Sequence, residues 1–537
     1  MPSPGVYVHG LAAAAAYSVA MQRAFNLVVV LAMGCATPAR AQVAAHDATI
    51  AGVTQAFAAG TLPCRRLVEG HLARIAAYDT QGPSLTALIR LNPRALETAD
   101  AMDAAYRTDR TAVGPLHCVP VILKDNFDTA DMPTTAGSRA LAESRPARDA
   151  FTVTQLRVAG ALILAKANLQ ELAMGGTTVS SLGGQTRNPY DLTRTPGGSS
   201  GGTAAAIAAG FGLVGTGSDT GQTIRSPASA TGLVGIRPTR GLVSRRGIVP
   251  VSLTQDEAGP IARTVADAAR LLDAIAGFDP EDPITATGVG HQPPTYAAFL
   301  DSNGLRGARI GVLREYFGTG PAHAEVNRVM ARAVEALRAH GAHVEDVAVP
   351  GLTELTADMA TGPFETRTAL NRYLRLLGPG AVVKDLAALV AGGDYHPAIA
   401  GQLKEAEANT AGMESPAYAA IFLRRDRLRV ALLAAMANQR LDAVLYPHQR
   451  RLVAAIGDEQ LERNGVLSNG TGFPAITLPA GWSAPTITAP LGVPVGLELL
   501  GREWSEGTLI RLGYAFEQAT QHRKTPASTP PLSAGPR

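Results

Sequence analysis

Cysteine is scarce in this sequence, which contains three among 537 residues, Cys35, Cys64 and Cys118. A fold held by a framework of disulfides needs many more cysteines than this. Cys35 lies in an apolar run near the N-terminus, and the other two are far apart along the chain. We therefore expect no disulfide framework, and we expect Cys64 and Cys118 to be small buried residues.

An excess of charge of either sign is also absent. The sequence has 48 Lys and Arg residues against 45 Asp and Glu residues, a formal net charge of +3. Loss of an N-terminal segment carrying Arg23 and Arg40 would lower the net charge to +1. There is no basic stripe of the kind that binds nucleic acid. These features argue against a nucleic-acid partner and favour a small ligand that is neutral or weakly charged.

Cofactor and metal motifs are missing as well. The sequence has no glycine-rich dinucleotide fingerprint and no internal repeat of fixed period. Its 11 histidines are scattered, and His340 and His343 form the only close pair, without an acidic or cysteine ligand set. We expect these two histidines to be solvated loop residues, and we predict an activity that needs neither a metal nor a cofactor.

The N-terminus lacks a hydrophobic run long enough to span a membrane. The run AFNLVVVLAMG, shortly after Met21, is about half of the ~20 residues that a span needs. A basic residue precedes it, and Ala-Arg-Ala follows, which matches a signal-peptidase site at Ala41/Gln42. We predict that residues 1–41 are an N-terminal extension and signal peptide, and that the mature chain is periplasmic or secreted, without stable membrane insertion. The alternative, a lipid anchor on Cys35, matches its motif only loosely.

Apolar residues make up 46% and charged residues 17% of the sequence, enough for a large core. Apolar runs typical of buried strands alternate with amphipathic segments typical of helices. We therefore predict one α/β domain over residues 42–537, in which residues 354–460 are mostly helical and form a lid or a pocket wall. The polar tail after residue 522 is the segment that we expect to be disordered.

The expected elements follow from these patterns. Expected strands lie at 119–127, 161–169, 211–218, 308–313, 342–349, 441–447 and 473–482. Expected helices lie at 47–78 in two parts, and at 93–107, 151–160, 203–210, 325–341 and 508–520.

The segment VPVILKDNF places Lys124 at the end of an apolar run. A surface lysine at a strand end is the common case, but here Val121, Ile122 and Leu123 continue a buried pattern. A lysine in a medium of low dielectric has a lowered pKa and can accept a proton as a general base. Because neighbouring residues of a strand point to opposite faces, Asp125 need not pair with it.

Ser199 and Ser200 lie between glycines in TPGGSSGGTAAAIAAG, residues 195–210. The glycines allow backbone conformations that are closed to other residues. Because an alanine-rich helix follows, the serines precede its N-terminus, where free N–H groups favour negative charge. A phosphate cradle would need a lysine in the Gly-Lys-Ser/Thr arrangement, which is absent. The segment therefore indicates two hydroxyls held for a chemical role.

The segment GSDTGQTIRSPAS, residues 217–229, leaves a predicted strand and turns at residues 220–223. Successive N–H groups in such a turn can form an anion nest, which is the structural basis of an oxyanion hole. Asp219 and Arg225 flank the turn. They could form a buried pair that clamps the loop or a surface pair, and the sequence alone leaves both open.

KDNF, GGSSGG and GSDTGQTIR, in this order and spacing, resemble the motifs of the amidase signature hydrolases. The resemblance extends to ELAMGG at 171–176 and to NGTGFPAITLPAG from residue 469, and it covers residues 48–525. It implies a large twisted, mixed β-sheet sandwiched between layers of helices. It also implies hydrolysis of amide bonds without a metal or a cofactor.

The family uses a Ser–cis-Ser–Lys triad. By the resemblance, the lysine is Lys124, the middle serine after a cis peptide bond is Ser199, and the nucleophile is Thr223. The usual motif ends in Gly-Gly-Ser, whereas this chain has Gly-Gln-Thr. A threonine hydroxyl can attack a carbonyl, but its methyl group restricts χ1. In the implied relay, neutral Lys124 takes a proton from Ser199, which takes one from Thr223.

The resemblance also assigns supporting roles. The oxyanion would rest on the backbone N–H groups of Thr223 and of Thr220, Gly221 and Gln222. Ser200, Asp219 and Arg225 would support the site. Ser200 and Thr220 offer alternative hydroxyls, at positions that usually support the nucleophile.

The resulting prediction is an exported amidase that hydrolyses a small carboxamide or a related amide through an acyl-enzyme on Thr223. Cleavage of an ester or a carbamate is compatible with the same residues. A catalytically inactive relative that binds an amide-like ligand in the periplasm is the alternative from another class. The family also includes the amidotransferase subunit that makes glutaminyl-tRNA, which the export signal and the lack of basic runs argue against. The substrate and homodimerisation remain open, and the candidates for pocket lining are Phe364, Tyr373, Tyr395 and Tyr418.

Overall fold

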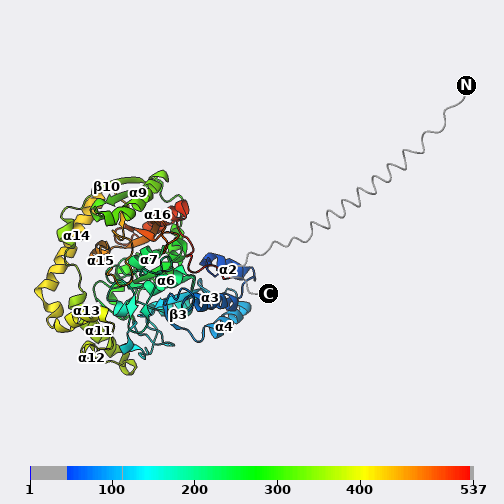
Figure 1. The fold of residues 1–537 in the computed structure, drawn as a ribbon, viewed down its shortest axis with the longest axis horizontal. Coiled ribbons are helices and arrows are strands. Elements are labelled where there is room, and N and C mark those ends of the chain that lie inside the picture. Colours follow the sequence, from blue (N-terminus) through cyan, green and yellow to red (C-terminus); the bar gives the residue numbers. More distant parts are fainter. Residues whose placement is uncertain (2–44, 112, 533–537) are drawn as a thin grey trace. The chain divides into compact units, whose positions relative to one another are not determined.

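The computed structural model describes residue 1 and residues 45–111 and 113–532 of the chain. The described residues after 44 form one compact unit (Figure 1). The predicted signal peptide lies outside the described residues, with its start near Met21, the alternative anchor Cys35 and the cleavage site at Ala41/Gln42.

The strands are β1 Leu88–Leu91, β2 Pro120–Lys124, β3 Leu162–Ala167, β4 Val179–Ser180, β5 Gly184–Gln185, β6 Val214–Asp219, β7 Val234–Arg237, β8 Glu257–Ala262, β9 Arg309–Leu313, β10 His343–Val347, β11 Ala443–Pro447, β12 Ala475–Trp482 and β13 Pro494–Leu500. The α-helices are α2 Ile50–Ala58, α3 Cys64–Tyr78, α4 Ala95–Thr108, α5 Phe151–Val158, α6 Gly201–Ala208, α7 Arg225–Ala230, α8 Val265–Ile275, α9 Ala324–Ala339, α10 Leu352–Thr356, α11 Gly362–Leu377, α12 Leu386–Gly392, α13 Ala400–Ala408, α14 Pro416–Asn438, α15 Val466–Thr471 and α16 Glu506–Thr520.

One mixed sheet of 11 strands forms the centre, in the order β1-β3-β2-β6-β8-β7-β12-β13-β11-β9-β10. β2 pairs in parallel with β3 and β6, and β9 pairs in parallel with β10 and β11. The strands from β6 to β11 in this order pair antiparallel. β2, β6, β8 and β13 are buried along their whole length. The apolar run of β2 predicts this burial, whereas β6 (VGTGSD) and β8 (EAGPIA) are buried without such a run. The predicted α/β fold class is confirmed.

Helices cover the sheet in layers. α6 and α7 contact each other, and they pack on strands that include β2, β6 and β7. α16 contacts both α8 and α9, and these three helices pack on strands that include β8 and β12. In Figure 1, α9 lies beside β10 at one edge of the sheet, and α4 lies near β3 toward the other.

Helix boundaries follow the signals in the sequence. Thr49 Oγ1 accepts a hydrogen bond from Gly52 N at 3.1 Å where α2 begins, as threonine does at many helix N-termini. The predicted helical segment 47–78 divides into α2 and α3. The break lies at Gly60, which has a φ of 64°, and at Pro63, which precedes α3. The expected pair of short helices is therefore confirmed.

Residues 354–460 are mostly helical, as expected, and contain α11 to α14. α11 and α13 share an apolar cluster with Leu374 and Leu403, whereas α14 contributes Leu428 and Leu432 to a separate cluster. Of the described helices, none is long and apolar enough to cross a membrane. The role of this segment as a lid stays a prediction.

Cys64 and Cys118 form a disulfide, which corrects the interpretation of both as simple buried residues. Both are fully buried. Cys64 begins α3 and Cys118 precedes β2, and their Cα atoms lie 5.7 Å apart, within the usual range for a disulfide. The two residues are 54 positions apart in sequence, so only the folded chain brings them together.

The tail after residue 522, which we expected to be disordered, contacts the body of the protein up to Pro530. Arg74 donates to the carbonyl oxygens of Thr529 at 2.8 Å and Pro530 at 2.9 Å. Tyr190 donates to the carbonyl oxygen of Lys524 at 2.6 Å, and Thr529 is fully buried. The expectation was wrong because a polar tail can be ordered by buried donors elsewhere in the chain.

Candidate active site

Two parallel neighbours in the sheet, β2 and β6, end at the same edge. β2 ends at Lys124 and β6 ends at Asp219, so both side chains reach this edge together with Ser218. The loop with Ser199 and Ser200 leads into α6, which packs on both strands. Three segments that are far apart in sequence therefore meet in one place.

Lys124 is fully buried, and its side-chain nitrogen has three partners. Nζ lies 2.8 Å from Ser199 Oγ, 2.8 Å from Ser218 Oγ and 3.3 Å from the Ser218 carbonyl oxygen. Asp125 pairs instead with Lys166 at 2.8 Å, because it points away from its neighbour in the chain. The structure thus brings two of the predicted catalytic residues, Lys124 and Ser199, into direct contact.

The environment of Lys124 suits a proton acceptor. Burial lowers its pKa from 10.5 to about 7, although the carboxylates of Asp219 and Asp256 act in the opposite direction. In the part of the chain that the structure describes, the groups within hydrogen-bond distance of Nζ are two hydroxyls and a carbonyl, and none is a carboxylate that would hold the proton on the amine. Near neutral pH, a substantial fraction of Lys124 is therefore uncharged and able to act as a base.

The loop that carries Ser199 has the shape that the resemblance implies. The Gly198–Ser199 peptide bond is cis. Gly197 has a φ of 73°, in the left-handed region that favours glycine. A Cβ on Gly202 would lie 2.1 Å from the carbonyl oxygen of Asn168, so this position admits no side chain. The glycines around the serines are thus required by the path of the chain.

Thr223 is buried, with 7% of its surface exposed, and its hydroxyl donates to the Ser218 carbonyl oxygen at 2.6 Å. The same oxygen accepts from Ser200 Oγ and from Lys124 Nζ, both at 3.3 Å. Within the described residues, no hydrogen bond joins Thr223 Oγ1 to Ser199 Oγ. The structure therefore places the Thr223 hydroxyl beside the partners of Lys124, but not in the predicted contact with Ser199.

The turn formed by Thr220, Gly221 and Gln222 is half-buried. No described residue accepts a hydrogen bond from the backbone N–H groups of Gly221, Gln222 or Thr223. Thr220 is held by its hydroxyl, which donates to Asp256 at 2.6 Å. Free N–H groups beside a buried hydroxyl form the donor set that an oxyanion hole needs.

Asp219 and Arg225 form a buried ion pair, the first of the two alternatives that the sequence left open. Both side chains are fully buried, and Arg225 Nε lies 3.1 Å from Asp219 Oδ2. Arg225 Nη2 also donates to the carbonyl oxygen of Gly221 at 2.7 Å. Burial alone would raise the pKa of Asp219, but the charges of Arg225 and Arg237 outweigh it and hold that pKa well below its ordinary value. The pair stays charged and fixes the turn.

Glu498 on β13 supports this pair, and sequence reasoning missed it. Its carboxylate accepts from Arg225 Nη1 at 2.6 Å and from the Tyr446 hydroxyl at 2.8 Å, and it contacts His448 Nδ1. All four side chains are fully buried. A single acid inside the apolar run VPVGLELLG was the available signal, because a buried strand carries a charge only where a partner meets it.

Ser218 was also missed. Its Oγ lies within hydrogen-bond distance of Lys124 Nζ and accepts from Asn126 Nδ2 at 3.0 Å. It lies directly before Asp219 at the end of β6, so the segment GSDTGQT could have pointed to it. Ser218 connects the lysine to the neighbouring cavity, which it also lines.

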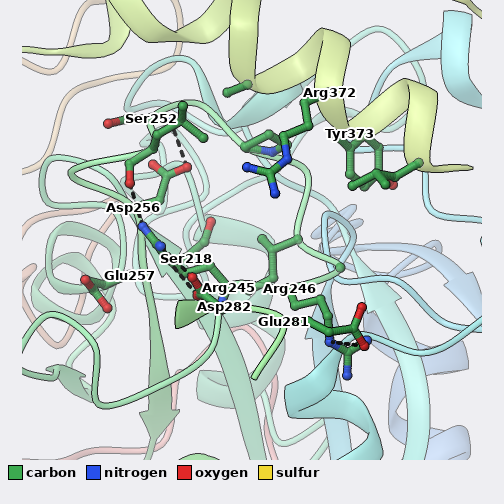
Figure 2. A pocket seen from close by; sticks show the side chains of 16 residues that line it. Ser218, Arg245, Arg246, Ser252, Asp256, Glu257, Glu281, Asp282, Arg372 and Tyr373 are labelled. Atoms are coloured by element: carbon green, nitrogen blue, oxygen red, sulfur yellow. Dashed lines mark hydrogen bonds and ion pairs between the residues drawn. The ribbon is translucent and has the colours of Figure 1, made fainter. Parts of the chain in front are cut away.

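A cavity of about 170 Å³ opens beside the site. Figure 2 shows Arg372 and Tyr373, which come from α11, on one side, and Ser218, Asp256 and Glu257 on the other. Its apolar wall is formed by Ile248, Pro250, Leu253, Ala369 and Leu376. The rest of the lining includes seven charged side chains, Arg245, Arg246, Asp256, Glu257, Glu281, Asp282 and Arg372. A cavity that combines an apolar wall with polar groups, adjacent to a buried base, has the character of a small-molecule site.

Of the four aromatic candidates, Tyr373 lines this cavity, and its hydroxyl donates to Asp128 at 2.7 Å. Phe364 and Tyr418 instead contact each other, with ring centroids 5.7 Å apart. Tyr395 packs against the apolar cluster around α11 and α13. Among the aromatic residues of the helical segment, the structure therefore favours Tyr373 as a substrate contact.

The described part of the chain contains no group of three or more His, Cys, Asp and Glu side chains placed to hold a metal ion. His340 and His343 are exposed, as expected, but His343 is the first residue of β10 and not a loop residue.

Comparison with known proteins assigns the class. A family model described as Amidase matches residues 66–510. The chain belongs to this amidase family, and it is an enzyme of the class that acts on C–N amide bonds.

Particular relatives agree with this assignment. A glutamyl-tRNA(Gln) amidotransferase subunit from Moorella thermoacetica is 38% identical over 470 residues, which cover 84% of this chain and 93% of the relative. The structure of the native peptide amidase from Stenotrophomonas maltophilia is similar with a TM-score of 0.80 and 39% identity, covering 89% of this chain and 98% of that chain. The structure of an amidase family protein from Bacillus anthracis is similar with a TM-score of 0.79 and 29% identity, covering 90% of this chain and 92% of that chain. The predicted family and fold are confirmed.

Proposed function

We propose that the mature protein is an exported amidase that hydrolyses a small carboxamide to a carboxylic acid and ammonia or an amine. The observation that carries this proposal is the 2.8 Å contact between Lys124 Nζ and Ser199 Oγ in a fully buried site. A buried lysine bound to a hydroxyl, rather than to a carboxylate, can pass a proton. The backbone N–H groups of residues 221–223, which have no acceptor among the described residues, supply the complementary oxyanion site.

Thr223 is the proposed nucleophile. The reaction begins with a rotation about χ1 that releases the Thr223 hydroxyl from the Ser218 carbonyl and turns it toward Ser199. Neutral Lys124 then accepts the Ser199 proton, Ser199 accepts the Thr223 proton, and Oγ1 attacks the substrate carbonyl carbon. The C–N bond breaks and the relay returns a proton to the leaving nitrogen. Water then cleaves the acyl ester and frees Thr223.

Export is proposed from the N-terminal sequence, and the disulfide between Cys64 and Cys118 supports it. Disulfides persist in oxidising compartments such as the periplasm and are rare in the cytosol. The disulfide lies within the catalytic unit itself, between α3 and the start of β2.

The proposed substrate is small because the cavity beside the site is about 170 Å³. The similarity to a peptide amidase adds peptide amides to the substrates that deserve testing. Esters and carbamates present the same carbonyl group to the nucleophile and belong in the same panel.

A fluorophosphonate probe tests the proposal. We expect the purified mature protein to be labelled on Thr223, located by peptide mass spectrometry, and labelling to be lost in Thr223→Ala. Ser200→Ala is the matched control, because it removes the neighbouring hydroxyl while leaving Lys124, Ser199 and Thr223 in place. Label that persists in Thr223→Ala would assign the nucleophile elsewhere. Absence of label together with absence of turnover across the panel would favour the alternative of a binding protein.

A second candidate function rests on the similarity to the glutamyl-tRNA(Gln) amidotransferase from Moorella thermoacetica. Glutamine is therefore included in the panel, with ammonia release as the readout. A clear preference for glutamine over the other carboxamides would favour the amidotransferase function. A preference for another carboxamide would support the exported amidase.

A further inference from the structure

A second cavity, of about 290 Å³, lies between α14 and the turn that follows α15. Its lining includes three arginines, Arg240 from the segment after β7 and Arg425 and Arg429 from α14. Figure 1 shows α14 at the outside of the molecule, next to α15. Neither the relay nor the proposed substrate cavity uses these three side chains.

The side chain of Arg240 is half-buried. Within the described residues it makes no side-chain hydrogen bond and no ion pair, and its Nε is buried. Its backbone N–H donates to the carbonyl oxygen of Gly472 at 3.1 Å, which fixes the chain here but leaves the side chain free. Burial lowers the pKa of Arg240, although the carboxylates of Glu257 and Glu365 act in the opposite direction without forming an ion pair with it.

Arg425 is only 6% exposed and is partly satisfied. Nε donates to the Gly470 carbonyl oxygen at 3.0 Å, and Nη2 donates to that of Thr254 at 3.2 Å. Nη1 is buried and has no acceptor among the described residues. Burial, followed by the charge of Arg240, lowers the pKa of Arg425 to about 10. Two cations therefore face one cavity with unused N–H donors.

The acidic residues of the cavity do not neutralise these two arginines. Glu503 pairs with Arg429 at 2.9 Å. Asp426 is exposed, and within the described residues it forms no ion pair with either Arg240 or Arg425. Leaving a buried donor on a charged group unsatisfied is costly, so the arrangement points to an acceptor that comes from solution.

We propose that this cavity binds a small oxyanion, a phosphate or sulfate group, between Arg240 and Arg425. Guanidinium groups present several N–H donors in a planar fork, and two such forks can share the oxygens of one tetrahedral anion. The site goes beyond the proposed amidase function and does not depend on it. Arg425 also donates to the carbonyl oxygen of Thr254, whose neighbours Ser252 and Leu253 line the proposed substrate cavity.

Isothermal titration of the full mature protein with inorganic phosphate, and separately with inorganic sulfate, tests the proposal. Sodium chloride at matched ionic strength controls for general salt effects. We expect saturable binding of at least one of the two oxyanions and a rise in melting temperature that follows its occupancy. Chloride should give neither.

The Arg240→Gln variant tests the assignment of the site. It should weaken oxyanion binding by about tenfold or more, because charge-assisted hydrogen bonds are lost. The variant should fold, since Arg240 makes no side-chain bond to the described residues. Arg66→Gln, at an exposed arginine of α3 without an ion pair among the described residues, is the matched control and should bind as the wild type does. Absence of saturable binding of both anions, or equal affinity in Arg240→Gln, would overturn the proposal.

Discussion

Thr223 carries a methyl group that a serine would lack, and its hydroxyl donates a hydrogen bond to the Ser218 carbonyl oxygen. A β-branched side chain has few χ1 positions, so turning the hydroxyl toward Ser199 also moves the methyl group. In a site where Ser199 and Thr223 are both buried, this movement has little free space. The residue therefore matches the chemistry of the proposed nucleophile while limiting how it can reach the relay.

Substitution of Thr223 tests this limit. We expect Thr223→Ser to keep or raise kcat/KM, because the serine hydroxyl rotates more freely. We expect Thr223→Ala to lower kcat/KM by about 100-fold or more, since the covalent intermediate can no longer form. Initial rates with the best carboxamide of the panel measure both effects. Wild-type activity in Thr223→Ala would remove this residue from catalysis.

The charge of Lys124 predicts how activity depends on pH. Burial lowers its pKa to about 7, so the amine is mostly protonated below that pH and mostly free above it. Only the free amine can accept the Ser199 proton. We therefore expect kcat/KM to rise about tenfold per pH unit below pH 7 and to level off above it. Rates measured between about pH 5 and pH 9 check this profile.

Lys124→Met supplies the control for the pH profile. This variant should lower kcat/KM by about 100-fold or more. The residual kcat/KM should no longer rise with pH up to about pH 7. A wild-type dependence of kcat/KM on pH in Lys124→Met would contradict the proposed proton relay.

At the scale of elements, β13 supports the turn at residues 220–223 through one side chain. Glu498 accepts from Arg225, and Arg225 in turn holds the Gly221 carbonyl oxygen. The strand lies on the far side of β7 and β12 from the strand that ends at Asp219. The position of the turn at residues 220–223 therefore depends on the packing of strands from both halves of the sheet.

Glu498→Ala should break this connection. Arg225 would lose one of its two carboxylate partners, and the buried Tyr446 and His448 would lose an acceptor. We expect a loss of about 3–5 kcal/mol in the free energy of unfolding, together with a fall in kcat/KM. Urea unfolding followed by circular dichroism measures the first effect. Glu335→Ala, at an exposed position of α9, should stay within about 0.5 kcal/mol of the wild type.

Sequence patterns predicted some elements well and missed others for physical reasons. α9 and α16 carry long amphipathic patterns, so their positions were expected. β8 reads EAGPIA and contains Gly259 and Pro260, which are unusual inside strands. Its pairing with β6 and β7 makes it a strand, and that pairing is a property of the whole sheet.

The sequence likewise predicted some residues of the candidate site and missed others. Lys124, Ser199 and the cis peptide bond were predictable, because motifs carry them. The contacts of Thr223 with Ser218, and of Arg225 with Glu498, depend on side-chain directions set by distant segments. Local sequence does not encode those directions by itself, which is why Ser218 and Glu498 were not found.

At the scale of the whole molecule, the disulfide joins α3 to the start of β2, the strand that ends at Lys124. Replacing Cys64 and Cys118 with alanine frees the unfolded chain from a loop of 54 residues. We expect a loss of about 4 kcal/mol in the free energy of unfolding from the lost constraint on the unfolded chain. Urea unfolding of the double variant and of the wild type measures it.

Thiol titration of the denatured mature protein provides the control for this prediction. If Cys35 leaves with the proposed signal peptide, no free thiol is expected before reduction and two are expected after it. Two free thiols before reduction would contradict both the disulfide and the support that it gives to export.

The contacts of Arg74 limit where the C-terminus of the protein can be truncated. Its guanidinium group connects two distant stretches of chain, because it donates to the carbonyl oxygens of Ala209 and of the neighbours Thr529 and Pro530. Truncation of the protein before Thr529 would remove two hydrogen-bond acceptors from the buried Arg74 side chain. A purification tag fused after Arg537 would leave both acceptors in place. A C-terminal truncation should therefore retain the chain through Pro530.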